Sequence, residues 1–216
     1  MITAIQGVAA PAADRQSLRK LMLERRRLVA LGEPERLERL RGHLQAWLER
    51  APAACIGFYR PIRAEPDLTE LLWRWKSESA GRRLCVPVID DLKTGRMHYG
   101  LWEKGQEKMG ACRILEPETD VPVEPDLIFS PCVGVTAEGF RLGNGGGFFD
   151  RWMAARRRGG VSLVSVAVAY ECLMTEAFSP MPYDEPMDWI LTESGMRRAE
   201  TKRAAPLPAQ PASTEC

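Results

Sequence analysis

Residues 126–135 read DLIFSPCVGV, a near-continuous run of apolar side chains. Such a run is typical of a central strand that is buried on both faces of a parallel sheet. A glycine cluster follows it, and residues 148–158 then have the pattern of a helix that ends before Gly159. Its last turn holds Arg156–Arg158, which we interpret as a solvated helix end. The sequence therefore predicts a strand, a glycine loop and a helix in succession.

Helical and strand patterns alternate through the rest of the chain. Caps and apolar periodicity predict helices over 14–31, 34–50 and 67–80, capped by Asp14 and Asp67, and strands over 55–59, 83–89, 162–170 and 189–191, with 96–101 as a hairpin partner. This alternation favours a single-domain α/β fold, layered α/β/α, with a mostly parallel central sheet. Ligands bind beyond the carboxyl ends of the strands in such sheets, and the glycine loop falls there.

The first predicted helix carries an apolar stripe and a basic one. The apolar side chains expected to pack on the core are Leu18, Leu21, Met22, Leu28 and Val29. Arg15, Arg19 and Arg26 recur at helical spacing. Spacing alone favours a solvated basic face, and contact of Arg15 and Arg19 with a polyphosphate is the alternative.

Length and composition are those of an ordinary globular protein. The 216 residues are 45% hydrophobic and 27% charged, with a formal net charge of +1, so no global charge attracts nucleic acid or a membrane surface. No apolar run approaches the roughly 18 residues that span a bilayer, and we expect a cytoplasmic protein. We also expect a flexible N-terminus over 1–13, one folded domain over 14–200 and a disordered Pro/Ala-rich tail over 201–216.

The cysteine and histidine pattern argues against a disulfide framework and a zinc site. None of the six cysteines forms a Cys-x-x-Cys pair, and most lie in apolar runs, as expected of small buried side chains in a reducing compartment. The two histidines, His43 and His98, are far apart in sequence. A zinc site or a histidine-based catalytic triad is therefore poorly supported.

Residues 141–151 read RLGNGGGFFDR, with four glycines in five positions. The backbone N–H groups of such a loop can approach an anion closely, and a helix that begins near Phe148 adds the positive end of its dipole. Arg141 and Arg151 can neutralise phosphate oxygens, and Asp150 can hold a bridging magnesium ion. The stretch matches neither a P-loop nor a dinucleotide-binding fingerprint. A plain flexible loop is therefore the alternative to a nucleotide phosphate site.

Two further groups of side chains can serve a binding site. Asp184, Glu185 and Asp188 can join Asp150 in a magnesium site built from carboxylate oxygens, or can cap and solvate their own loop. Glu65 follows the first strand, where it can accept hydrogen bonds from two adjacent N–H groups of an amino-heterocycle such as a pterin or guanine. It can equally be a surface charge.

Over residues 14–195 these segments resemble the 5-formyltetrahydrofolate cyclo-ligase family, also called methenyltetrahydrofolate synthetase. The loop over 141–151 is similar to the family's Arg-Leu-Gly-x-Gly-Gly-Gly-aromatic-Tyr-Asp-Arg stretch. The other matching segments, in the family's order, are the upstream basic helix, Phe58-Tyr59 followed by Glu65, Glu116-Pro117, Asp126-Leu127-Ile128 and 184–193. Their order along the chain makes the resemblance more specific than the loop alone.

The resemblance implies an enzyme that closes 5-formyltetrahydrofolate to 5,10-methenyltetrahydrofolate, using ATP and Mg²⁺ and releasing ADP and phosphate. It implies phosphorylation of the formyl oxygen, attack by folate N10 and loss of phosphate. Such phosphoryl transfer needs positioning and charge neutralisation more than a nucleophile. The implied partners are the small-molecule folate and ATP, with no nucleic acid and no membrane, and we expect a monomer.

The resemblance also implies roles for individual residues. Arg141 and Arg151 are the expected catalytic residues, and Asp150 and Asp184 are the expected magnesium ligands. The residues expected to bind ATP are Arg15, Arg19, Arg141, Gly143, Asn144, Gly145, Gly146, Gly147, Phe148 and Phe149. The residues expected to face the folate are Arg60, Glu65, Asn144 and Phe148.

A few positions near the expected site differ from the family's usual pattern. Phe149 stands where tyrosine is usual, and Cys112 and Arg113 stand where an aromatic residue and a glycine are common. Arg15 replaces a lysine and Tyr183 a frequent histidine. The alternative function is therefore that of a divergent family member, which binds nucleotide or folate but acts on another substrate.

Overall fold

The computed structural model describes residues 14–119 and 121–201, so the segments predicted to be flexible, 1–13 and the tail from 202 onward, lie outside the described residues. The long helices are α1 (Arg15–Gly32), α2 (Glu35–Leu48), α3 (Thr69–Ser77) and α4 (Phe148–Arg158), with two short 3-10 helices, η1 (Ala111–Arg113) and η2 (Glu171–Leu173). All four predicted helices are confirmed. Among the described helices, none is long and apolar enough to cross a bilayer.

One seven-stranded sheet forms the centre of the molecule. In spatial order its strands are β11 (Gly195–Arg198), β10 (Trp189–Thr192), β9 (Val164–Val168), β6 (Leu127–Pro131), β1 (Cys55–Gly57), β2 (Arg83–Asp91) and β3 (Arg96–Leu101). Neighbours from β10 to β2 are parallel, and β11 and β3 pair antiparallel at the two edges. Two small hairpins, β4 (Glu107–Met109) with β5 (Leu115–Pro117) and β7 (Gly134–Val135) with β8 (Arg141–Leu142), lie outside it. The mostly parallel central sheet is confirmed.

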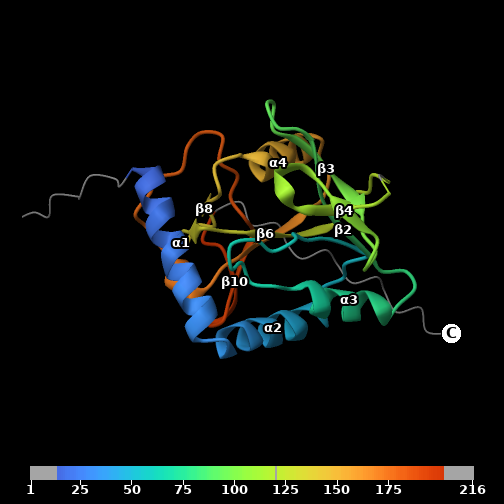
Figure 1. Cartoon of the computed structure of the whole chain (residues 1–216), viewed down its shortest axis with the longest axis horizontal. Helices are drawn as coiled ribbons and strands as arrows, with labels where there is room; N and C mark the ends of the chain where they lie inside the picture. The colour runs from blue at the N-terminus through green and yellow to red at the C-terminus, as the bar shows by residue number, and fades with distance from the viewer. Residues whose placement is uncertain (1–13, 120, 202–216) are drawn as a thin grey trace, which may run out of the picture.

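Helices cover both faces of this sheet, α2 and α3 on one side and α4 on the other (Figure 1). Because side chains alternate along a strand, β6 serves both layers. Phe129 belongs to the core that contains Leu44 of α2, whereas Ile128 belongs to the core that contains Met153 of α4. Two hydrophobic cores result, one on each face, and the predicted α/β/α layering is confirmed.

The apolar run over 126–135 is not one strand. β6 ends at Pro131, whose nitrogen has no hydrogen to donate to a ladder. The chain then leaves the central sheet, and Gly134–Val135 pair with Arg141–Leu142 in a separate hairpin. As a result Arg141 lies on a buried strand that leads into the glycine loop.

Helix ends follow the predicted caps with small differences. The Asp14 carboxylate accepts a hydrogen bond from the Ser17 amide, which confirms it as the N-cap of α1. The Asp67 carboxylate accepts one from the Thr69 amide, but Leu68 is the N-cap residue of α3. The α3 helix also ends at Ser77, three residues before the predicted end.

The helix α1 crosses the carboxyl edge of the sheet and does not cover a face. Its buried residues are Leu18, Met22 and Arg26, one narrow stripe at intervals of four. The prediction that Leu21 and Leu28 pack on the core is wrong, since they are 50% and 58% exposed. Because α1 packs on loops at the edge of the sheet, only a narrow stripe of its side chains is buried. Arg26 occupies the last buried position of that stripe.

Two leucine substitutions test this difference between α1 and α2. Leu44→Ala removes a fully buried side chain, so it should lower the free energy of unfolding by about 2–5 kcal/mol. Leu28→Ala, the matched control on an exposed helix face, should change it by less than about 0.5 kcal/mol. Urea denaturation measures both values. Equal losses would contradict the described orientation of α1.

Candidate active site

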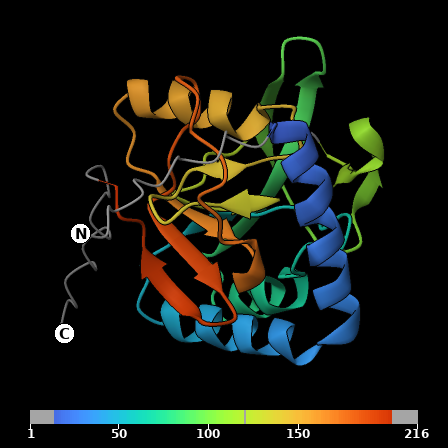
Figure 2. The same cartoon turned by 90° about the vertical axis from the view of Figure 1, so that its left-hand side faces the viewer.

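The candidate site lies where the parallel strands end. The segments that gather there are the 58–66 loop after β1, Cys132 after β6, and the turn around Gly95 after β2. α1 runs across this edge, as Figure 2 shows, and the glycine loop joins it from the β8–α4 connection. Arg151 links the turn around Gly95 to the glycine loop, because its guanidinium donates to the carbonyls of Gly95 (3.5 Å) and Gly146 (2.6 Å). The predicted placement of the glycine loop is confirmed.

The three arginines of α1 turn inward, so the favoured interpretation of a solvated basic face is wrong. Arg15 pairs with Asp184, and Arg19 Nε donates to the carbonyl of Gly143 at 2.8 Å. Arg26 is fully buried and reaches the loop after β1 and the end of β6. Each guanidinium thus binds a different loop at the edge of the sheet, which explains why a stripe of charge packs against the protein.

The glycine loop leads into α4 with its amides available. α4 begins at Phe148 as predicted, and its N-cap is Gly147, which has a left-handed φ of 65° and gives no side-chain cap. The first N–H groups of a helix have no partner within the helix. The loop therefore presents backbone donors and the positive end of a helix dipole to any bound anion.

Arg141 and Asp150 form a buried ion pair beside this loop. The Arg141 Nη2 atom lies 2.8 Å from Asp150 Oδ1, and the two side chains are 4% and 13% exposed. The Glu185 amide donates to the same oxygen at 3.2 Å. The Phe149 ring lies against the arginine, 5.3 Å from Cζ to the ring centroid. The structure therefore joins the glycine loop to the acidic segment near 185.

Asp184 and Asp150, the two predicted magnesium ligands, come from adjoining segments. Asp184 Oδ2 accepts from the Met181 amide at 2.8 Å and pairs with Arg15. Asp150 Oδ2 and Asp184 Oδ1 accept none of the described hydrogen bonds. The described residues contain no cluster of three or more metal-binding side chains. Two carboxylates with free oxygens nevertheless fit Mg²⁺, which takes one or two carboxylates together with water and phosphate oxygens.

Glu185 and Asp188 are engaged elsewhere and do not join these two carboxylates. Arg157 pairs with Glu185 at 2.7 Å and donates to the Pro186 carbonyl at 2.8 Å. Asp188 is buried and accepts hydrogen bonds from the amide and hydroxyl of Ser165. These contacts fasten the acidic segment to α4 and β9.

The arginine run at the end of α4 is therefore not simply a solvated helix end. Arg157 is only 18% exposed, and Arg156 is 16% exposed and pairs with Glu124. Arg158 alone of the three is exposed. The prediction is wrong for the first two because α4 ends close to acidic residues that neutralise them.

Glu65 lies beside the glycine loop. It is 6% exposed, and its Oε2 atom accepts from the Ile62 amide at 3.0 Å. Arg26 Nη1 lies 3.5 Å from Oε1. Burial raises the pKa of the Glu65 carboxyl, while the Ile62 amide, Arg26 and the nearby Asn144 side chain act in the opposite direction. The alternative of a surface charge is wrong.

Arg60 and Phe148 have other surroundings. The Arg60 guanidinium pairs with Glu107 at 2.9 Å, donates to the Thr69 hydroxyl and lies over the Trp102 ring. No hydrogen bond or ion pair among the described residues joins Arg60 to Glu65 or to the glycine loop. Phe148 is partly buried and packs on the core under α4. The structure thus brings Glu65 and Asn144 together and leaves Arg60 with partners of its own.

The site carries an excess of positive charge. Five arginines (Arg15, Arg19, Arg26, Arg141 and Arg151) stand with three carboxylates (Glu65, Asp150 and Asp184). Three buried guanidinium nitrogens also lack a hydrogen-bond partner, namely Arg15 Nε, Arg26 Nη2 and Arg141 Nε. Unpaired buried donors are uncommon in proteins. An anion with several oxygens would satisfy this arrangement better than a neutral ligand.

The cysteines offer no reactive thiol at the site. Cys55, Cys85 and Cys132 are buried as predicted, whereas Cys112 is exposed and Cys172 half-buried. Cys216 lies outside the described residues. Burial raises the pKa of the Cys132 thiol to about 12, so this group stays protonated near neutral pH.

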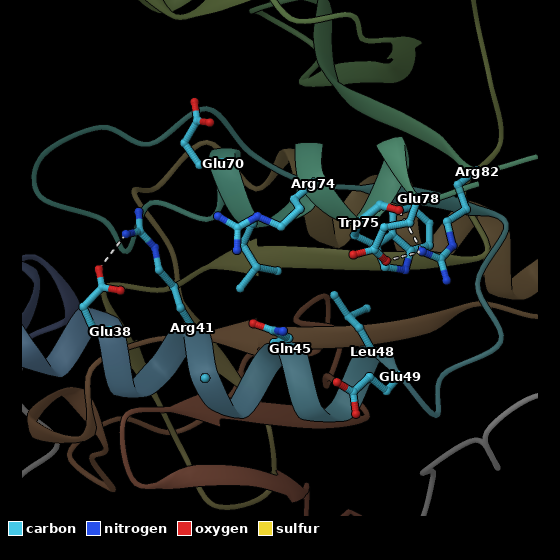
Figure 3. A pocket seen from close by; sticks show the side chains of 12 residues that line it. Glu38, Arg41, Gln45, Leu48, Glu49, Glu70, Arg74, Trp75, Glu78 and Arg82 are labelled. Carbon is cyan, nitrogen blue, oxygen red and sulfur yellow. Dashed lines mark hydrogen bonds and ion pairs between the residues drawn. The ribbon is translucent and has the colours of Figure 1, made fainter. Parts of the chain in front are cut away.

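Among the cavities near the surface, two differ in their surroundings. One, of about 630 Å³, adjoins Asp184 and is walled mainly by Phe140, Met181 and three prolines. The other is a groove of about 330 Å³ between α2 and α3. Figure 3 shows ion pairs among its charged side chains, Arg41 with Glu38 and Arg82 with Glu78. None of the predicted site residues lines this groove.

Comparisons with known proteins identify relatives of this chain and of its fold. A family model described as 5-formyltetrahydrofolate cyclo-ligase family matches residues 11–193. The Escherichia coli (strain K12) 5-formyltetrahydrofolate cyclo-ligase is 30% identical over 66% of this chain and 77% of its own. The enzyme of the same name from Mycolicibacterium smegmatis is 27% identical over 83% and 93%. An NMR structure of Aquifex aeolicus 5,10-methenyltetrahydrofolate synthetase covers 89% of this chain and 96% of its own, with a TM-score of 0.71 and 28% identity.

Adjacent arginines of α4 test the attachment of the acidic segment. Arg157→Ala should lower the free energy of unfolding by about 2–3 kcal/mol, because it leaves buried carboxylate and carbonyl oxygens unpaired. Arg158→Ala, the exposed neighbour, should change it by less than about 0.5 kcal/mol. Thermal and urea unfolding measure the difference. A loss at Arg158 as large as that at Arg157 would show that the run acts as a uniform basic helix end.

Proposed function

We propose, because the chain belongs to the 5-formyltetrahydrofolate cyclo-ligase family, that it converts 5-formyltetrahydrofolate to 5,10-methenyltetrahydrofolate with ATP and Mg²⁺, and releases ADP and phosphate. The observation that carries the proposal is that α1 reaches both Glu65 and the glycine loop, because Arg26 Nη1 lies 3.5 Å from Glu65 Oε1 and Arg19 Nε donates to the Gly143 carbonyl at 2.8 Å. The helix α1 thereby links a carboxylate that can bind a folate ring to a glycine loop that can bind phosphates. One site can therefore hold both substrates next to each other.

The residues proposed for the nucleotide are those with spare donors around the loop. Arg15, Arg19 and Arg141 face the ATP phosphates, together with the amides of residues 143–149. Arg151 keeps the loop in place through the Gly146 carbonyl. Asp150 and Asp184 would hold Mg²⁺, which when bound neutralises phosphate charge. Arg15 pairs with Asp184 and Arg141 with Asp150, so the two carboxylates do not make the site negative before ATP binds.

The folate is proposed to lie on the Glu65 side of the loop. A carboxylate can accept hydrogen bonds from two adjacent N–H groups of a pterin ring, and burial of Glu65 makes each such bond more valuable than at the surface. Asn144 and Phe148 complete this wall. Arg60 is proposed to act there through its position after β1, although its guanidinium is paired with Glu107.

The chemistry suits residues that position substrates and neutralise charge. The formyl oxygen takes the terminal phosphoryl group of ATP, and ADP leaves. N10 then bonds to the formyl carbon and loses its proton, and the carbon–oxygen bond breaks with departure of inorganic phosphate. Arginines and backbone amides stabilise the charge on the moving phosphoryl group. No protein nucleophile is required, which agrees with the protonated, buried Cys132.

We further propose that the enzyme works in the cytoplasm as a monomer, with the folate and ATP as its small-molecule partners. The supporting observation is that Cys55 and Cys85 are unbonded thiols although their sulfurs are 3.9 Å apart. In an oxidising compartment, two thiols this close would readily form a disulfide bond. Neither nucleic acid nor a membrane has a role in the proposed reaction.

A direct assay tests the proposed reaction. Purified protein mixed with 5-formyltetrahydrofolate and Mg²⁺ should form the methenyl product, followed by its absorbance, only when ATP is present. Stoichiometric ADP and phosphate should appear with it. Folate binding without turnover would instead support the divergent relative that acts on another substrate.

A second test concerns the proposed metal ligands. Asp150→Ala should lower turnover by roughly 100-fold or more, since it removes a group that orders the metal, Arg141 and the loop together. Asp150→Asn preserves the shape and should still raise the Mg²⁺ concentration that gives half-maximal activity. Glu70→Ala, a paired carboxylate of the groove between α2 and α3, should retain wild-type turnover. Undiminished activity of Asp150→Ala would refute the metal role.

A further inference from the structure

Arg26 is the one fully buried arginine among the described residues, with no exposed surface. Its guanidinium reaches three segments at once. Nε donates to the Arg63 carbonyl at 3.0 Å, Nη1 donates to the Cys132 carbonyl at 3.2 Å, and Nη1 lies 3.5 Å from Glu65 Oε1. The family resemblance gave no role to this residue.

The turn that carries Glu65 is strained, and Arg26 holds it. Arg63 and Ala64 both have left-handed backbones, with φ of 49° and 62°. Such conformations cost free energy in residues other than glycine and persist where neighbouring contacts hold them, often at functional sites. The Arg63 carbonyl is the group to which Arg26 Nε donates. Glu65 follows directly, and its carboxylate lies beside the same guanidinium.

The guanidinium has more donors than its structural contacts use. Its Nη2 atom is buried and has no hydrogen-bond partner among the described residues. An arginine retained only to brace a turn would rarely leave a buried N–H group unpaired. The contacts to the turn therefore do not account for the whole guanidinium, which also places its positive charge next to Glu65.

We propose that Arg26 is a positioning residue for substrate recognition, which fixes the Glu65 carboxylate and its negative charge where two adjacent N–H groups of the folate ring bind. The inference rests on the proposed function and adds to it a residue that acts through Glu65. In this role Arg26 acts on the folate through Glu65. Its loss should therefore weaken folate binding and leave the use of ATP intact.

The electrostatic consequence has a definite sign. Burial raises the pKa of Glu65, and Arg26, Arg63, the Ile62 amide and Asn144 oppose that rise. The remaining neighbours, Tyr59 and Cys132, are buried groups whose own pKa values are raised, so they stay neutral. Without Arg26, Glu65 takes up a proton at higher pH than in the wild type. Folate binding then weakens as pH falls.

The experiment compares Arg26→Gln and Arg26→Lys with the wild type from pH 6 to 9. Arg26→Gln should raise the KM for 5-formyltetrahydrofolate about 10-fold or more, as expected for a misplaced buried hydrogen-bonding group. The increase should be greater at pH 6 than at pH 9, and the KM for ATP should stay within about twofold. Arg26→Lys keeps the charge and should restore most of the wild-type pH profile.

A double-mutant cycle tests whether Arg26 acts through Glu65. In a Glu65→Gln background, Arg26→Gln should cause little further loss of folate binding, because the partner is already gone. Folate binding measured without ATP gives the same comparison independently of turnover. Arg74→Gln, an arginine of the groove between α2 and α3, is the matched control and should match the wild type.

Three results would overturn the proposal. They are an unchanged folate KM in Arg26→Gln, a loss that is independent of pH and not restored by lysine, and losses that add fully in the double mutant. If Arg26→Gln does not fold, as judged by circular dichroism, the decision falls to Arg26→Lys and its double mutant with Glu65→Gln. If the wild type forms no methenyl product, the proposed function and this inference fail together, whereas an active wild type with an unaffected Arg26→Gln rejects the inference alone.

Discussion

A guanidinium removed from water must find acceptors and negative charge in the protein, and this constraint at Arg26 organises the carboxyl edge of the sheet. α1 can pack there because its last buried position is filled by a group that binds the loop after β1 and the end of β6. The same contacts set the strained turn at Arg63 and Ala64. The direction of α1 in turn decides which loops Arg15 and Arg19 can reach.

The site is therefore held together by charge more than by shape. Arg15, Arg19 and Arg151 each bind a separate segment, and Arg141 binds Asp150. Hydrophobic packing under both faces of the sheet fixes the strands, and charged side chains join the loops above them. Ion pairs and hydrogen bonds from charged groups are strong enough to order such loops. They also leave donors that a polyphosphate can use.

The periodicity of the sequence was enough to predict the helices, the parallel sheet and the edge at which the glycine loop lies. It did not predict how α1 packs, because Leu21 and Leu28 fit an apolar stripe as well as Leu18 and Met22 do. One signal was available. Arg26 continues the series Leu18, Met22 at intervals of four, and an arginine in a buried series is a candidate for a paired internal charge. The small hairpin of Gly134–Val135 with Arg141–Leu142 had no comparable signal.

By itself, the sequence determined the elements, the layered fold and the chemical types gathered near the glycine loop, since these depend on local patterns of apolar, glycine and charged residues. Only the tertiary structure decided which charges meet. Asp184 faces Arg15 across 169 positions of the chain, whereas Glu185 and Asp188 turn to Arg157 and Ser165. In the sequence these three carboxylates look alike, because they are acidic residues of one short segment. Their partners depend on which elements fold against them, and no local pattern records that.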